Sequence, residues 1–124
     1  GRGRRVIHLS SHSFTSELDG EVRRADAGLL YDPARPGEKA LCARWKAALA
    51  HRAPALRVRR NYPYAGRGDG LTSHLRRRFQ PGEYLGIELE INQAMVAAGG
   101  AAWAALGPLL AETFQSACSA GETE

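Results

Sequence analysis

Two glutamates lie close together in a segment with a strand-like pattern. From Leu85 to Asn92 the odd positions are all apolar, and the even positions include Glu88 and Glu90. Strand side chains alternate between faces, so these two glutamates share one face, with Cα atoms about 7 Å apart. A carboxylate held at a strand end is suited to act as a general base or a metal ligand. The alternative is a half-exposed strand whose polar face meets solvent. Glu90 is nearer the carboxyl end, where α/β sheets normally place their sites.

A second strand-like run extends from Arg5 to Ser11. His8 lies within this run, and His12 follows directly after it, four positions later. Four strand residues span about 13 Å, whereas a histidine nitrogen lies about 2 Å from bound zinc. At most one of the two can therefore bind a given zinc ion. His12 is the better placed, because the strand should give way to a loop there. The alternative is a histidine hydrogen-bonded within the core or a loop.

A third polar group lies at the exit of another strand-like run, Leu56 to Arg60, and includes Asn61 and Tyr64. Arginine can grip a carboxylate through two parallel hydrogen bonds, and asparagine and tyrosine supply neutral donors. The alternative is an ordinary turn with surface arginines. If each group sits at the carboxyl end of a strand in a parallel sheet, all three should gather in one cleft.

The elements that must position these residues alternate along the chain. We expect strands at Arg5–Ser11, Ala27–Tyr31, Leu56–Arg60 and Tyr84–Ile91, and helices at about Glu38–Arg52, Leu71–Phe79 and Ala102–Ala117. The apolar odd positions predict that Tyr84–Ile91 is an interior strand of the sheet. Ser13–Arg24 and Asn61–Gly70 have loop character, Gly99-Gly100 marks a break, and an irregularity is expected near Gly107-Pro108. This order predicts an α/β fold with a mixed, partly parallel sheet flanked by helices. We expect one domain over residues 1–118 and a polar tail over 119–124.

Composition and charge narrow the function classes. The chain has 124 residues, of which 44% are hydrophobic and 24% charged, as expected of a globular domain. Residues 1–80 hold all 17 basic and 7 acidic residues, and residues 81–124 hold 6 acidic residues and no Lys or Arg. This asymmetry leaves a basic nucleic-acid-binding module as an alternative, although the arginine triplet at 76–78 would wrap around a helix rather than line one face. No membrane partner is expected, and two cysteines indicate a reducing cytoplasm rather than a disulfide scaffold.

The three polar groups together carry a family resemblance. The ordered set is His12-Ser13-Phe14, then Arg60-Asn61-Tyr62-Pro63-Tyr64 with Gly66, then Gly86-Ile87-Glu88-Leu89-Glu90-Ile91-Asn92-Gln93. It closely resembles the C-terminal half of the N-formylglutamate amidohydrolase family, which is similar in fold to the zinc carboxypeptidases and to aspartoacylase-type deacylases. The resemblance implies a phosphorylase/hydrolase-like fold, of which this chain would be the C-terminal portion.

The resemblance also implies roles for single residues. His12 resembles the third ligand of one zinc ion, Glu90 resembles the catalytic carboxylate with Glu88 as runner-up, and Arg60, Asn61 and Tyr64 resemble substrate-contacting positions. The implied substrate is a small acidic N-acyl, or formyl, amino acid. The family's first two zinc ligands lie in an N-terminal half, so they are expected upstream of Gly1. The implied function is zinc-dependent amide hydrolysis, and the alternative is a catalytically inactive half-domain whose partner is the missing half.

Overall fold

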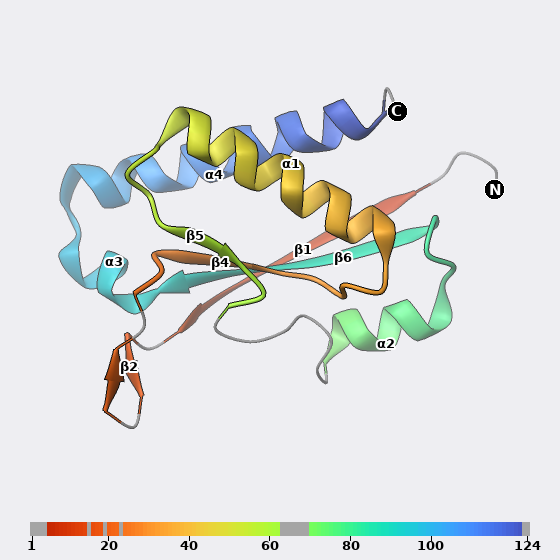
Figure 1. Cartoon of the computed structure of the whole chain (residues 1–124), viewed down its shortest axis with the longest axis horizontal. Coiled ribbons are helices and arrows are strands. Elements are labelled where there is room, and N and C mark those ends of the chain that lie inside the picture. The colour runs from red at the N-terminus through yellow and green to blue at the C-terminus, as the bar shows by residue number, and fades with distance from the viewer. Residues whose placement is uncertain (1–4, 15, 19, 23, 63–69, 123–124) are drawn as a thin grey trace.

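The computed structural model describes residues 5–14, 16–18, 20–22, 24–62 and 70–122. Its elements in chain order are β1 (Val6–Phe14), β2 (Glu17–Leu18), β3 (Glu21–Val22), β4 (Ala27–Leu30), α1 (Pro36–Arg52), β5 (Val58–Arg60), α2 (Leu71–Arg78), β6 (Tyr84–Asn92), α3 (Gln93–Ala98) and α4 (Gly100–Glu122) (Figure 1). None of the described helices is long and apolar enough to cross a membrane.

The main sheet has four strands in the order β1-β6-β4-β5. β1 runs parallel to β6, and β4 runs parallel to β5, but β4 and β6 are antiparallel. The expected mixed, partly parallel α/β sheet is confirmed, and β6 is an interior strand as its apolar odd positions predicted. β2 and β3 form a small separate antiparallel pair in the segment that we expected to be a loop. Strands of two residues are too short to leave a periodic pattern in the sequence.

Helices cover both faces of this sheet, with α1 and α4 on one side and α2 on the other (Figure 1). The odd residues of β6 face α1 and α4, where Ile87 is fully buried together with Trp45 of α1. The Trp45 indole donates a 2.9 Å hydrogen bond to Thr113 of α4, and its ring meets Phe114 at a centroid distance of 4.8 Å. Burial of apolar surface between the sheet and these two helices is the main stabilising term for such a fold. The opposite face of the sheet is left to the polar even positions.

The C-terminal helices differ in detail from the expectation. Gly99 and Gly100 have positive φ angles of 56° and 72°, which places the expected break between α3 and α4. Helix α3 was not expected; the Asn92 side chain caps it by accepting a hydrogen bond from the Ala94 N–H at 2.9 Å. Pro108 lies inside α4, which continues through it and ends only at Glu122, within the segment expected to be a polar tail.

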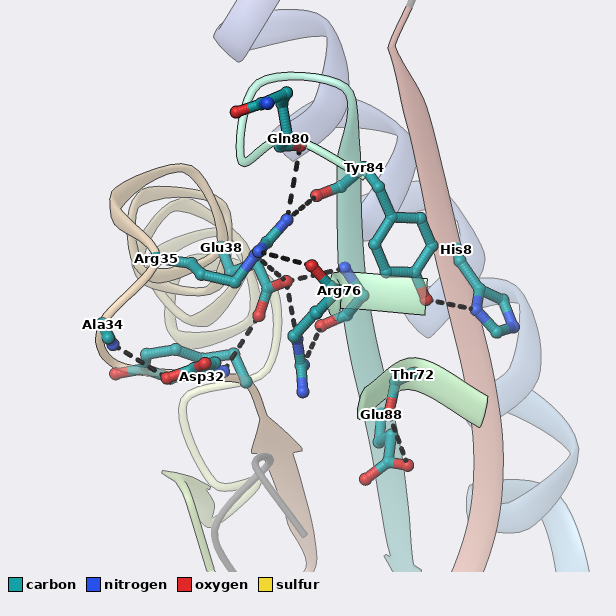
Figure 2. Close-up of polar contacts among 12 residues, drawn as sticks. His8, Asp32, Ala34, Arg35, Glu38, Thr72, Arg76, Gln80, Tyr84 and Glu88 are labelled. Atoms are coloured by element: carbon teal, nitrogen blue, oxygen red, sulfur yellow. Dashed lines mark hydrogen bonds and ion pairs between the residues drawn. The ribbon is translucent and has the colours of Figure 1, made fainter. Parts of the chain in front are cut away.

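A buried ionic network holds β6 where β4 leaves the sheet. The last residue of β4, Leu30, pairs with Glu88, so no strand is left to pair with Gly86 on this side. The fully buried carboxylate of Glu38 takes that place, accepting from the Gly86 N–H at 2.9 Å. The Arg76 side chain donates one hydrogen bond to the Gly86 carbonyl at 2.7 Å and another to the Glu38 carboxylate at 2.9 Å (Figure 2). Two side chains thus satisfy the backbone groups that a strand would have satisfied.

Candidate functional site

Four residues form a row across the sheet, one from each strand. His12 of β1 pairs with Glu90 of β6, Glu90 pairs with Gly28 of β4, and Gly28 pairs with Arg59 of β5. Directly paired residues share a face, and neighbouring strands lie about 4.8 Å apart. The histidine and the carboxylate singled out in the sequence are therefore adjacent side chains on one face.

The row forms only in part for the reason that we expected. We expected convergence at the carboxyl ends of parallel strands, but β5 runs antiparallel to β6, through β4, so its carboxyl end points the other way. Arg59 still reaches the level of Glu90 because the three-residue β5 pairs with the start of β4. His12 and Glu90 meet near the common carboxyl end of the parallel strands β1 and β6, whereas register brings Gly28 and Arg59 to the same level.

Glu90 is almost completely enclosed, with 7% of its surface exposed. The chain after β5 folds back over the neighbouring Gly28, where an added Cβ would overlap the carbonyl oxygen of Tyr62. The Tyr62 ring meets Phe14 of β1 edge-on at a centroid distance of 6.4 Å. This aromatic cover contacts strands on both sides of β6 and restricts access of water to the sheet face that carries Glu90. Low water access strengthens electrostatic interactions at such a carboxylate.

Glu88 lies on the same face in different surroundings. Its carboxylate is half-buried and accepts a hydrogen bond from the Thr72 hydroxyl of α2 at 3.3 Å (Figure 2). Helix α2 therefore covers the face at Glu88, whereas Tyr62 covers it near Glu90. The two glutamates are thus distinguished by their neighbours as well as by their position on the strand.

The two histidines of β1 differ in their exposure and in their hydrogen bonds. Nδ1 of His8 is hydrogen-bonded to the Tyr84 hydroxyl at 2.7 Å (Figure 2). Nε2 of His8 is hydrogen-bonded to the Ser10 hydroxyl at 3.1 Å. Burial raises the pKa of Tyr84, which keeps that hydroxyl protonated. His12 is exposed beside Glu90. With both ring nitrogens of His8 engaged, His12 is the histidine of this strand that is open to a ligand.

The structure separates the expected substrate-contacting residues. Arg60 pairs with Leu29, whose side chain lies in the core beneath α1, so Arg60 is on the opposite face from Glu90. Asn61 has a positive φ of 52°, and its side-chain Oδ1 accepts a hydrogen bond from the Tyr31 N–H at 3.0 Å, so this side chain holds the turn after β5. Tyr64 lies outside the described residues. The register places Arg59 on the Glu90 face instead, as the alternation of Leu56, Val58 and Arg60 with the other arginines could have indicated.

The donor atoms of the described residues do not make a complete metal site. Over these residues no group of three or more His, Cys, Asp and Glu side chains could hold one metal ion. A catalytic zinc normally has three protein ligands. The exposed imidazole of His12 can serve as one ligand, but the described chain does not fit zinc by itself.

Two cavities of about 480 and 490 Å³ flank β1, and neither includes His12 or Glu90 in its lining. The first lies between β1 and α2 and is lined mainly by apolar residues such as Leu71, Leu75 and Phe79. The second lies between β1 and α4, beside Trp103 and Leu106. The candidate chemistry therefore belongs to the sheet face at the row, beside the Tyr62 cover, and not to these apolar cavities.

The α/β sheet of this protein places an enclosed carboxylate, Glu90, beside a histidine, His12. This pair of side chains is typical of proteins that carry out hydrolytic chemistry. Residues 1–97 match the family model described as N-formylglutamate amidohydrolase, and the chain belongs to that family. Among solved structures it is similar to the crystal structure of the gene product Atu2144 from Agrobacterium tumefaciens, with 32% sequence identity and a TM-score of 0.73. The similarity covers 97% of this chain and 44% of that chain, so the present chain spans less than half of its length. No curated protein matches the chain.

Proposed function

We propose that this protein is a hydrolase of N-acyl amides that removes a formyl group from an acidic amino acid. The observation that carries the proposal is the direct cross-strand pairing of His12 with Glu90 in a chain of the N-formylglutamate amidohydrolase family. Hydrolysis of an amide requires a base to activate water and an acid to protonate the leaving amine. A carboxylate beside an imidazole can supply the first of these and, once protonated, the second.

Glu90 is the proposed base, and Glu88 is the runner-up. Glu90 takes a proton from the attacking water, and the same carboxyl group delivers it to the leaving nitrogen. The products are formate and the free amino acid. Glu88 is the runner-up because it pairs with Ser10 and lies beside Thr72 of α2, whereas Glu90 pairs with His12. The cover provided by Tyr62 keeps bulk water away from the reacting face.

The proposal includes one zinc ion with His12 as a ligand and with the other ligands supplied from outside the described residues. When bound, zinc would polarise the amide carbonyl and lower the pKa of a coordinated water. The coverage of 44% of the related structure is consistent with an N-terminal half that completes the enzyme, and that half is the proposed partner. The reduced thiols of Cys42 and Cys118 are compatible with the reducing cytoplasm that we propose as its location.

The same partial coverage favours one alternative, a catalytically inactive half-domain. The nucleic-acid-binding alternative loses support, because several arginines already serve the fold. Arg35 and Arg76 bind Glu38, Arg57 binds Asp26, and Arg44 donates to the Ala117 carbonyl within α4. These side chains are not available as a continuous phosphate-binding surface.

Formate release from N-formyl-L-glutamate tests the proposal, measured with the intact enzyme that carries this chain and with the chain alone. We expect the intact enzyme to release formate, to lose activity on chelation, and to regain it with zinc. His12→Ala should lower its bound zinc and its activity together. Zinc-independent activity would contradict the metal assignment, and an intact enzyme that releases no formate from any N-formyl amino acid would refute the function.

A further inference from the structure

The two edges of the main sheet differ in how well they are protected. One edge is β5, which has three residues and carries the charged side chains of Arg59 and Arg60. The other edge is β1, whose nine residues pair with β6 without a bulge and include no proline, lysine, arginine, aspartate or glutamate. Short strands, charges, prolines and bulges are the features that keep a sheet edge from binding another strand. The edge at β1 has none of these protections.

Alternate backbone groups of β1 point away from β6. The Val6 N–H donates to the Glu83 carbonyl at 2.8 Å, so the backbone of Val6 faces β6, and the even residues after it do the same. The odd residues turn their backbone groups outward: Ile7, Leu9, Ser11 and Ser13. In the described part of the chain no strand pairs with this side of β1. Its outward N–H and C=O groups can therefore receive one more strand.

Apolar surface borders this edge on both faces of the sheet. On the α2 face, the cavity of about 480 Å³ is lined by the exposed side chains of Val6, Leu71 and Phe79. On the α4 face, the cavity of about 490 Å³ is lined in part by the exposed ring of Trp103. Among the described residues, Val96 is the only large exposed hydrophobic residue outside these two cavities. Contiguous exposed apolar surface marks a site where another protein surface binds.

We propose that the N-terminal half of the enzyme docks on β1, adding a strand to its open edge and covering both apolar cavities. The inference rests on the proposed function, which names that half as the partner. More than half of the related structure lies outside the part that this chain matches, so enough chain exists there to cover the edge. A strand added about 4.8 Å from β1 also brings further side chains close to His12, whose proposed metal site the described residues do not complete.

Amide hydrogen exchange, followed by NMR on this chain alone and on the intact enzyme, tests the inference within one strand. In the chain alone, the outward amides of Leu9 and Ser11 should exchange within about tenfold of the rate of an unstructured peptide. In the intact enzyme, the same amides should exchange at least about 100-fold more slowly than in the chain alone. The inward amides of Ser10 and His12 are the internal control, because the β1–β6 ladder protects them in both forms.

A proline at position 11 provides a second test. Ser11→Pro removes an outward N–H at an exposed residue and leaves the hydrogen bonds to β6 in place. The matched control is Ser11→Ala, which keeps that N–H. In the intact enzyme, the urea midpoint of Ser11→Pro should lie below that of Ser11→Ala. In the chain alone, the two variants should have nearly the same midpoint, because the outward N–H has no strand partner there.

The apolar cavities are tested in the same way. Leu71→Ser should lower the urea midpoint of the intact enzyme and leave that of the chain alone nearly unchanged, because docking is what buries Leu71. The matched control is Val96→Ser, which replaces an exposed aliphatic residue outside both cavities and should change neither midpoint.

Rapid exchange of the outward amides in the intact enzyme would overturn the inference, and formate release by that enzyme would show that the proposed function survives. Slow exchange without formate release would support the inference and refute the proposed function. Analytical ultracentrifugation of the chain alone tests the other occupant. A dimer that already protects the outward amides, and that Ser11→Pro dissociates, would assign the edge to a second copy of this chain and overturn the inference.

Discussion

His12 and Glu90 are direct neighbours on adjacent parallel strands, although 78 positions separate them in the sequence. Their side chains share the face of the sheet that α1 and α4 leave uncovered. Because the pairing is part of the β1–β6 ladder, its geometry is set by backbone hydrogen bonds and not by a loop. Sites built on such elements are held more precisely than sites on loops.

The buried carboxylate of Glu38 should be essential for stability. Glu38→Gln removes the negative charge that compensates the guanidiniums of Arg76 and Arg35 and places an amide donor near the Gly86 N–H. Breaking a buried ion pair by removing one partner typically costs about 3–5 kcal/mol. We expect a loss of that size in the free energy of unfolding, measured by urea denaturation.

The matched control is Glu112→Gln, which breaks the exposed Arg52–Glu112 pair. Its partners are 47% and 59% exposed, so the loss should not exceed about 1 kcal/mol. Similar effects of the two substitutions would show that the network does not replace the missing strand partner of Gly86.

Gly28→Ala should disturb the cover over the site. The new methyl group overlaps the Tyr62 carbonyl, so the chain after β5 must move away from the sheet. Forced repacking of this kind typically costs about 1–3 kcal/mol. Urea denaturation should show this loss, and near-ultraviolet circular dichroism should show a changed tyrosine environment.

Gly107→Ala is the opposite case, because nothing lies within 4 Å of a Cβ added there, inside α4. Replacing a helical glycine with alanine should stabilise the protein by about 0.5–1 kcal/mol. If Gly28→Ala proved as harmless as Gly107→Ala, Tyr62 would not rest on Gly28 in solution.

Stability should fall in alkaline solution because of the buried thiol of Cys42. Burial, reinforced by the charge of Glu38, raises the pKa of this thiol from 9.0 to about 12. Between these values the unfolded chain loses the thiol proton while the folded protein keeps it. The free energy of unfolding should therefore decline above pH 9, with a slope approaching 1.4 kcal/mol per pH unit for one proton.

Cys42→Ala should remove this slope between pH 9 and 10, before the raised pKa of Tyr84 adds a similar effect at higher pH. Cys118→Ala leaves Cys42 in place and should keep the slope. Guanidinium denaturation across this pH range measures how the free energy of unfolding of each variant depends on pH. If the slope is unchanged in Cys42→Ala, Cys42 is not its source.

The sequence predicts the strands of this protein well where apolar residues alternate. The apolar odd positions of β6 predicted an interior strand, and the structure buries them against α1 and α4. The same alternation predicted that Glu88 and Glu90 share a face. Both predictions depend on local periodicity, which sheet geometry preserves.

The sequence could not predict how distant strands align. The row from His12 to Arg59 depends on the register and direction of four strands, and β4 and β5 run opposite to β6. The role of Glu38 was missed for a related reason. Glu38 lies in the first turn of α1, where an acidic residue is ordinary, and only the departure of β4 makes it the partner of Gly86. The role of Tyr62 depends likewise on Gly28, over thirty positions earlier in the chain.

The kinetics of Glu90→Gln beside Glu88→Gln in the intact enzyme test the central claim most directly. The readout is formate release from N-formyl-L-glutamate, with bound zinc and fold verified in both variants. A general base contributes about 10²–10⁴-fold in rate, so kcat of Glu90→Gln should fall by at least that factor. Glu88→Gln, which loses only its contact with Thr72, should cost far less. Full activity in Glu90→Gln together with an inactive Glu88→Gln would contradict the assignment of the base, and full activity in both would show that the paired His12 and Glu90 are not a catalytic site.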